Sequence, residues 1–213
     1  LMWEEAGHRK TNKHYEHRLK RISLPDNENE NVPPLRVFGQ YPGLKNLGST
    51  CYMNAFLQQL HKIPSFCDSV LSLPNLDESS FLFSLQMLFA SMSNATQAYI
   101  DTTGLCSKLK EYDGSSINVM EQKDVVEFAG LLFEHMERES MSARRILKDH
   151  FEGVLVNQII SSDPENPYVS EIKEPFLMLP LDIKNRRTLN EALEAFVEGE
   201  QMSGDNQYKL PTG

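Results

Sequence analysis

Apolar residues recur at helical spacing through the middle of the chain. Tyr52, Phe56 and Leu60 fall on one stripe, which predicts a helix that has Cys51 in its first turn. In residues 121–139, EQKDVVEFAGLLFEHMERE, the apolar side chains recur at i, i+3, i+4, i+7 and i+11. This segment is therefore expected to form an amphipathic helix with one face in the core. Further helices are expected at residues 65–73, 81–92 and 104–109.

The pattern changes after residue 150. Residues 151–160 alternate loosely and are rich in β-branched side chains, and the stretch SSDPENP that follows is typical of a turn. Residues 168–183 are expected to form two strand-like pieces, with Pro175 and Pro180 near their ends. A helix is expected again at residues 189–196, behind a cap at Thr188 or Asn190. Helices followed by strands favour the α+β class.

The first 34 residues differ from the rest in composition. Residues 1–22 hold six Lys or Arg against three Asp or Glu, and Tyr15, Leu19 and Ile22 fall at helical spacing. This predicts a basic amphipathic helix with a solvated face, with a membrane or nucleic-acid arm as the alternative. Residues 23–34, SLPDNENENVPP, read as an acidic linker. We therefore expect three parts: residues 1–34, 35–150 and 151–213.

Composition limits the class of protein and of partner. The 213 residues are 40% hydrophobic and 24% charged, as in a globular domain with a real core. The net charge of −9 argues against nucleic acid as the main partner and favours a basic protein. The longest apolar stretch, residues 81–90, is broken by two polar residues and is too short to span a bilayer. No membrane association is therefore expected.

The three cysteines, Cys51, Cys67 and Cys106, form no CxxC pair and leave an odd number. This usage fits a reducing compartment and gives neither a disulfide framework nor a zinc site. We therefore expect an intracellular protein, in the cytoplasm, the nucleus or both, with no cofactor. The chain begins with Leu1 and has no basic-then-apolar leader pattern, so it is expected to be part of something longer.

Cys51 carries the strongest chemical signal. Gly43 and Gly48 loosen the backbone before it, and the apolar-periodic run begins directly after it. The unpaired N–H groups at a helix N-terminus stabilise a thiolate and can also receive a developing oxyanion. Asn46 offers a side-chain amide donor just upstream. A lone cysteine in an apolar helix is more often a small core residue, so position alone leaves both readings open.

Residues 43–60, GLKNLGSTCYMNAFLQQL, resemble the cysteine box of the ubiquitin-specific proteases, which are papain-like deubiquitinases. QKDVVEF at residues 122–128 is similar to the family's second box, Q-x-D-x-x-E-F. The likeness covers roughly residues 41–208 and is greatest to the very large members. Later segments that resemble the family are F-x-G-x-L at 151–155, E-P-F-x-x-L-x-L-x-I at 174–183 and E-x-x-x-G-D-N-x-Y at 200–208.

The resemblance implies a papain-like cysteine protease fold, with a helical thumb followed by the start of β-rich fingers and palm, as an incomplete domain. It implies that Cys51 attacks the bond after the C-terminal glycine of ubiquitin, and that Asn46 and the Cys51 N–H stabilise the oxyanion. It also implies that Gln122 and Asp124 bind the ubiquitin tail, where a carboxylate can pair with an arginine. Local stabilisation of a helix N-terminus explains both residues equally well.

The sequence contains neither the zinc ligands nor the histidine motif of the family. Many family members hold a zinc ion in the fingers with two CxxC pairs, but here the first turn reads DPENP and Tyr208 is followed by Lys209 and Leu210. Of the six histidines, His61 lies about 15 Å along the helix from Cys51, and the others match no family motif. We expect ubiquitin and ubiquitinated proteins as partners, a histidine from outside the chain, and no hydrolysis by this fragment alone. The alternative is a catalytically inactive ubiquitin-binding or scaffolding module. The oligomeric state stays open.

Overall fold

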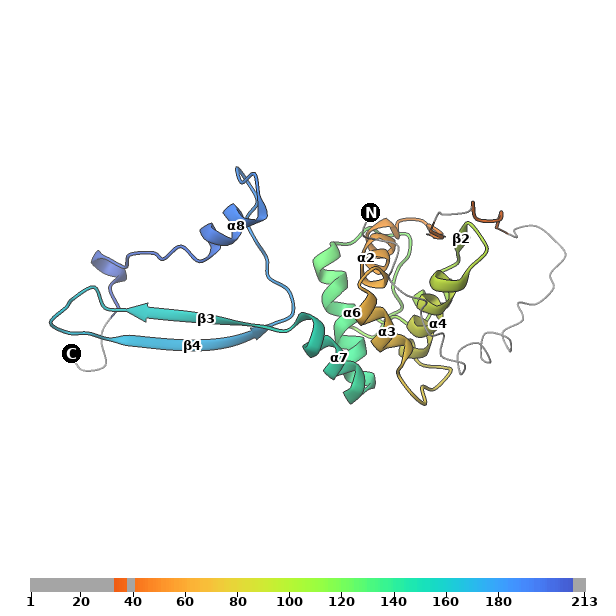
Figure 1. Cartoon of the computed structure of the whole chain (residues 1–213), viewed down its shortest axis with the longest axis horizontal. Coiled ribbons are helices and arrows are strands. Elements are labelled where there is room, and N and C mark those ends of the chain that lie inside the picture. Colours follow the sequence, from red (N-terminus) through yellow and green to blue (C-terminus); the bar gives the residue numbers. More distant parts are fainter. Residues whose placement is uncertain (1–32, 38–40, 209–213) are drawn as a thin grey trace, which may run out of the picture. The chain divides into compact units, whose positions relative to one another are not determined.

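The computed structural model describes residues 33–37 and 41–208, without the side chain of Asn206. The chain divides between Arg144 and Arg145 into two compact units of mixed helix and strand (Figure 1). The basic segment expected at residues 1–22 and most of the expected linker lie outside the described residues. None of the helices in the described part is long and apolar enough to cross a membrane.

Helices dominate the first unit (Figure 1). Helix α4 contacts α3, α5 and α6, and α2 contacts α3 and α6, so each helix buries its apolar stripe against neighbours. Phe66, Phe89 and Phe128 are almost completely buried between them. These helices are α2 (Cys51–His61), α3 (Pro64–Leu71), α4 (Phe81–Asn94), α5 (Thr103–Cys106) and α6 (Val125–Glu139).

Two short strands also belong to this unit, where the sequence predicts helices alone. Strand β1 (Gly43–Leu44) pairs in parallel with β2 (Tyr99–Ile100), and Leu35 forms an isolated bridge with Gln97. Two residues are too few for an alternating pattern, which explains why the sequence gives no sign of these strands. The pairing ties the segment that leads to α2 against the segment that follows α4.

Helix α7 (Met141–Phe151) is absent from the expectations drawn from the sequence. Its segment MSARRILKDHF is strongly polar, and within it Ala143 and Leu147 are fully buried. Ala143, Ile146, Leu147 and Phe151 fall at i, i+3, i+4 and i+8, but this short stripe includes a small alanine and lies among charged residues, so it is weak. Phe151, which the sequence places at the start of a strand, is instead the last residue of this helix.

The second unit contains a long antiparallel hairpin. Strand β3 (Gly153–Ile160) pairs with β4 (Val169–Phe176) in register from Gly153–Phe176 to Ile160–Val169. The second strand-like piece expected up to residue 183 is wrong, because residues 177–183 have no regular structure and Pro180 lacks the N–H that a ladder needs. Helix α8 (Leu189–Phe196) follows as expected, and a short 3-10 turn, η1 (Gly204–Asn206), precedes Tyr208.

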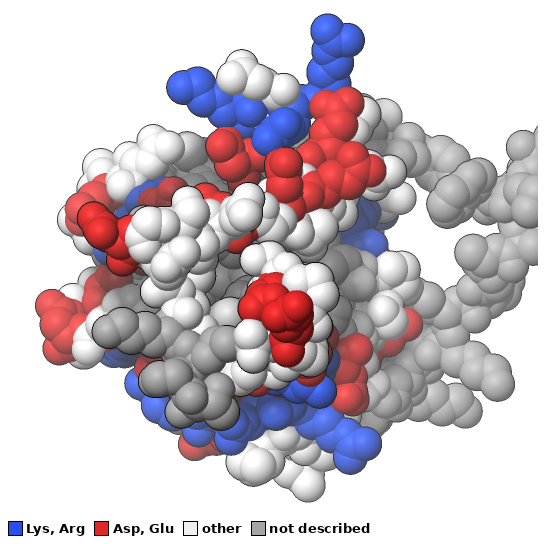
Figure 2. All heavy atoms as spheres, turned by 90° about the vertical axis from the view of Figure 1, so that its left-hand side faces the viewer, with Lys and Arg blue, Asp and Glu red and all other residues white. Residues whose placement is uncertain are grey.

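Surface charge of both signs accompanies this fold. Asp and Glu side chains lie beside Lys and Arg side chains at several places on the face drawn in Figure 2. Although the net charge is −9, the described residues of that face do not form one continuous acidic patch.

A buried glutamine holds the end of one helix in the first unit. Gln86 lies on α4 and is completely buried, and its Nε2 donates to the carbonyl oxygens of Val70, Leu71 and Leu73, at 3.1, 3.3 and 3.0 Å. These carbonyls belong to the last turn of α3 and the residues after it, where no intrahelical donor remains. One side-chain amide therefore supplies donors to the Leu71 and Leu73 carbonyl oxygens and a second donor to that of Val70, which also accepts from the Leu73 N–H at 3.2 Å.

Replacing Gln86 with leucine tests this cap. The leucine keeps the approximate size but leaves buried carbonyl groups unpaired, so Gln86→Leu should lower the free energy of unfolding by about 2–3 kcal/mol. Urea unfolding followed by circular dichroism measures it. Gln59→Leu, the same change at an exposed position of α2, is the matched control. Equal stability of the two variants would show that the carbonyls are satisfied in another way.

Candidate active site

Cys51 is the first residue of α2, and its side chain is exposed. Cys67 and Cys106 are buried, and burial raises the pKa of the Cys106 thiol. The reading of Cys51 as a core residue is therefore excluded. The next two residues, Tyr52 and Met53, are buried and anchor the first turn, so the thiol is held at the surface by a fixed helix end.

A hydrogen-bonded cluster shapes the loop before Cys51. The Asn46 side-chain oxygen, Oδ1, accepts from the Gly48 N–H, the Thr50 N–H and the Thr50 hydroxyl, each at 3.1 Å. The Thr50 hydroxyl oxygen accepts in turn from the Leu47 N–H at 3.1 Å. Thr50 is completely buried, whereas Asn46 is exposed. With the oxygen engaged by three donors, the Nδ2 amino group is the end of the Asn46 amide that remains to donate elsewhere.

The same cluster leaves the start of α2 uncapped by a side chain. Thr50 is the N-cap residue, but its hydroxyl makes no capping bond. At this position a threonine oxygen ordinarily accepts from an N–H of the first turn. Here the hydroxyl is engaged by Asn46 and Leu47 instead, and the first-turn N–H groups keep their capacity to bind an anion.

A second loop supports the first from the side. Gly48 has φ +144°, and a Cβ atom built there would lie 2.6 Å from Met120 Sδ and 3.0 Å from the Val119 carbonyl oxygen. The Ser49 N–H donates to that same Val119 oxygen at 2.8 Å. Only glycine fits this conformation and this close approach. Residues 119–120 therefore fix the bend that leads to Cys51.

Two amides on α2 fix the other end of the loop. Asn54 Nδ2 donates to the carbonyl oxygens of Leu44 and Lys45, at 3.3 and 3.1 Å, and Gln58 Nε2 donates to that of Pro42 at 2.9 Å. The two residues lie four apart and so share one helix face. The sequence marks both residues only as part of the motif at residues 43–60. Two amides four residues apart on one face of α2 were the available signal.

Gln122 and Asp124 follow the supporting loop, and both are exposed. Asp124 is the N-cap of α6, because its Oδ1 accepts from the Val126 N–H at 2.7 Å and from the Glu127 N–H at 3.3 Å. Helix α6 therefore begins at Val125 rather than at residue 121. One oxygen of the carboxylate, Oδ2, has no such bond. No hydrogen bond joins Gln122 or Asp124 to Asn46 or Cys51 within the described residues.

Aromatic and ionic contacts hold this segment in place. The rings of Tyr52 on α2 and Phe128 on α6 meet edge to face, with centroids 5.4 Å apart. Lys123 Nζ lies 2.9 Å from Glu111 Oε1, and this hydrogen bond raises the pKa of Lys123. Gln122 and Asp124, on either side of Lys123 in the sequence, are exposed.

The described histidines are all engaged away from the thiol. His61 ends α2, ten residues after Cys51, which is about 15 Å along a helix. His135 is buried on α6 and hydrogen-bonds the main chain of Lys110 at 2.8 Å, and His150 Nδ1 bonds a carbonyl of its own helix. The remaining three, His8, His14 and His17, lie outside the described residues.

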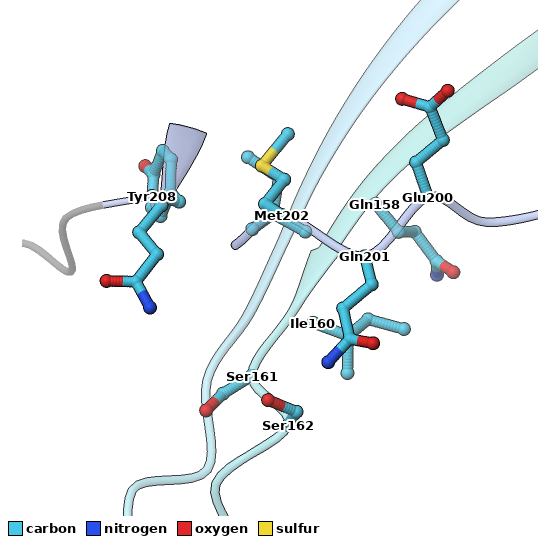
Figure 3. Close-up of a pocket in the computed structure, with 10 residues that line it drawn as sticks. Gln158, Ile160, Ser161, Ser162, Glu200, Gln201, Met202 and Tyr208 are labelled. Atoms are coloured by element: carbon cyan, nitrogen blue, oxygen red, sulfur yellow. The ribbon is translucent and has the colours of Figure 1, made fainter. Parts of the chain in front are cut away.

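Other polar groups give no further reactive centre. Among the residues that the structure describes, no group of three or more His, Cys, Asp or Glu side chains could hold a metal ion. A cavity of about 300 Å³ in the second unit lies between the end of β3 and residues 200–208 (Figure 3). Gln158, Ser161, Gln201 and Met202 line it, and Tyr208 stacks on Tyr168 with ring centroids 6.1 Å apart. It contains no nucleophilic thiol.

Gly48→Ala tests the close approach of the two loops. The variant should lose about 1–3 kcal/mol of stability, because alanine is strained at this φ and its Cβ meets the Val119 oxygen. Thermal and urea unfolding measure the loss. In the control Gly104→Ala, the added Cβ meets nothing within 4 Å, and stability should stay the same or rise. A Gly48→Ala variant as stable as wild type would mean that residues 119–120 do not constrain the bend.

Comparison with known proteins identifies the family. The family model described as ubiquitin carboxyl-terminal hydrolase matches residues 42–195. Mouse ubiquitin carboxyl-terminal hydrolase 24 is 32% identical over 185 residues, which are 83% of this chain and 7% of that protein. Human ubiquitin carboxyl-terminal hydrolase 40 is 32% identical over 196 residues, 84% of this chain and 16% of that protein. Ubiquitin C-terminal hydrolase 13 of Arabidopsis thaliana is 32% identical over 171 residues, which are 79% of this chain and 15% of that protein.

The chain thus spans less than a fifth of the length of these relatives. The matched residues nevertheless include the loop before Cys51, all of α2 and the start of α6. The chain therefore belongs to the ubiquitin carboxyl-terminal hydrolase family, whose papain-like cysteine protease fold it shares.

Proposed function

We propose that the protein is a thiol-dependent deubiquitinase, which hydrolyses the bond after the C-terminal glycine of ubiquitin inside the cell. One observation carries the proposal. The exposed thiol of Cys51 stands at a helix start without a side-chain cap, directly after a loop that holds the Asn46 carboxamide by its oxygen. A nucleophile and donors for an oxyanion are what acyl transfer to a thiol requires. Its partners are ubiquitin and ubiquitinated proteins.

The reaction proceeds in two steps. The Cys51 thiolate attacks the carbonyl carbon, so a C–S bond forms and the carbonyl electron pair moves to oxygen, where Asn46 Nδ2 and the Cys51 N–H donate hydrogen bonds. The C–N bond then breaks, and the leaving amine takes a proton from a general acid. Water attacks the resulting thioester and releases the ubiquitin carboxylate and the Cys51 thiol. The group that moves the protons comes from outside the described residues, because their histidines are engaged elsewhere.

Asp124 and Gln122 bind the extended tail of ubiquitin in this proposal. Asp124 uses Oδ1 to cap α6, and its other oxygen is available for a guanidinium group from the exposed surface. Capping and recognition are therefore compatible in one carboxylate. Two roles in one residue also mean that an alanine substitution cannot separate them, whereas an asparagine keeps the capping oxygen.

A catalytically inactive ubiquitin-binding module is the second candidate, favoured by one observation. The described residues place no histidine beside Cys51, and a thiol without a base would leave the surface around Asp124 able to bind but not to turn over. Release of a fluorophore from the C-terminus of ubiquitin separates the two functions. If the protein releases the fluorophore and Cys51→Ala abolishes this turnover, the protein is a hydrolase. If it binds ubiquitin without turnover, and longer forms of the protein also lack turnover, it is a binding module.

Reaction with ubiquitin whose C-terminus carries an α,β-unsaturated methyl ester tests the nucleophile, because a thiolate adds to the β-carbon of this group and the α-carbon takes up a proton. A single covalent adduct should form, and peptide mass spectrometry should place it on Cys51, because that is the exposed thiol of the three. Cys51→Ala should lose the adduct completely, and Cys106→Ala should keep it. An adduct on another cysteine, or one that survives in Cys51→Ala, would remove Cys51 from the mechanism.

Asp124→Asn tests tail recognition without removing the helix cap. The change should weaken ubiquitin binding roughly ten-fold, the size of one charge-assisted hydrogen bond, with thermal stability unchanged. Isothermal titration calorimetry measures the affinity. Asp77→Asn is the matched control, since Asp77 is also exposed and its Oδ1 accepts from a turn N–H. Unchanged affinity in Asp124→Asn would leave this residue with its capping role alone.

A further inference from the structure

We infer that Thr50 is a positioning residue that orients the Asn46 carboxamide toward the reacting carbonyl. The inference rests on the proposed function and adds a residue that acts through Asn46 rather than on substrate. Thr50 supplies two of the three donors on Asn46 Oδ1, its N–H and its hydroxyl, both at 3.1 Å. It is therefore the main partner of the Asn46 side chain.

The direction of these bonds selects one orientation of the amide. A side-chain amide has an oxygen and an amino group of similar size, so rotation by 180° exchanges an acceptor for a donor at almost no steric cost. The Gly48 and Thr50 N–H groups can only donate, so the rotated amide would face them with N–H groups of its own. The oxygen must therefore point into the loop and Nδ2 away from it.

The hydroxyl of Thr50 is itself held in one direction. Its oxygen accepts from the Leu47 N–H at 3.1 Å, and its proton is directed to Asn46 Oδ1. Thr50 is completely buried, so water does not compete for this hydroxyl, whereas Asn46 is exposed to water. A buried clamp thus determines the direction of an exposed amide, which would otherwise rotate among solvent partners.

Helix capping does not account for this threonine. The hydroxyl makes no bond to the first turn of α2, although Thr50 is the N-cap residue. Threonine is favoured at an N-cap because its oxygen can accept from a first-turn N–H, and Thr50 does not use its hydroxyl in this way. The side chain instead makes both of its hydrogen bonds to residues before it in the chain.

The test compares Thr50→Val with Thr50→Ser in the 213-residue chain. Valine keeps the shape of threonine and removes the hydroxyl, and serine keeps the hydroxyl and removes the methyl group. Thr102→Val is the matched control, because Thr102 is also a buried N-cap threonine without a capping bond and precedes α5. Two-dimensional NMR spectra of each variant report whether the fold is retained.

The first readout needs no catalysis. NMR couplings across hydrogen bonds, from the Gly48 and Thr50 amide nitrogens to the Asn46 side-chain carbonyl carbon, should be present in wild type, Thr50→Ser and Thr102→Val. They should be lost or at least halved in Thr50→Val. Absence of the couplings in wild type would overturn the inference even if Thr50→Val failed to fold, and so would full couplings in Thr50→Val.

The second readout connects orientation with chemistry. A thiolate adds reversibly to ubiquitin with a C-terminal aldehyde. An S–C bond forms, the C=O π bond breaks, the carbonyl carbon becomes tetrahedral, and its oxygen takes up a proton from solvent. Affinity for this aldehyde should fall about ten-fold in Thr50→Val and further in Asn46→Ala, with Thr50→Ser near wild type. Affinity for ubiquitin with its ordinary carboxylate should be unchanged in all of them.

The two readouts separate failure of the inference from failure of the proposed function. If Asn46→Ala leaves aldehyde affinity unchanged, Asn46 does not bind the oxyanion, and the couplings still decide whether Thr50 orients its amide. If Asn46→Ala weakens the aldehyde complex and Thr50→Val matches wild type in both readouts, Thr50 has no positioning role.

Discussion

The Asn46 side-chain oxygen accepts three hydrogen bonds, and the shape of the whole loop before α2 depends on them. These bonds hold the backbone of residues 46–50 in a turn. They engage the Thr50 hydroxyl, which therefore does not cap α2. The Asn46 amide nitrogen is the end of the side chain that takes no part in them. A helix start ordinarily uses such a hydroxyl to satisfy its own N–H groups. Here the hydroxyl makes no capping bond, and the result is an exposed thiol at a helix start whose first-turn N–H groups carry no side-chain cap.

The position of Cys51 at a helix start could be predicted from the sequence, but the contacts that support its loop could not. Glycines followed by an apolar-periodic run locate Cys51 at a helix start, because both signals are local. The Asn46 side chain is held by its oxygen only in one rotation of its amide, and the amino-acid sequence does not reveal that rotation. The roles of Asn54 and Gln58 depend on carbonyl groups 9 to 16 residues away. Sequence motifs therefore mark these amides without saying what they bind.

Prediction of the fold succeeded where the sequence carries a clear apolar stripe and failed where that stripe is weak. Helices α2, α4 and α6 each have several apolar turns, so their pattern survives in the sequence. Helix α7 buries Ala143 and Leu147, but its apolar stripe lies among charged residues and is too weak to stand out in the sequence. The start of α6 was misplaced because Asp124 turns the chain from extended to helical at one residue. After Phe176, apolar residues continue without a partner strand in the described part of the chain, and composition alone suggested a strand.

The contacts that support the loop before Cys51 have a consequence for biosynthesis. The Ser49 N–H is bonded to the carbonyl oxygen of Val119, and Gly48 packs against Met120, so two segments some 70 residues apart must meet. Contacts between distant segments form only after the intervening chain is available. On the ribosome, the thiol cannot be set in its bend until residue 120 has left the exit tunnel and the helices between have packed. A nascent chain that stalls earlier would carry the cysteine but not the arrangement around it.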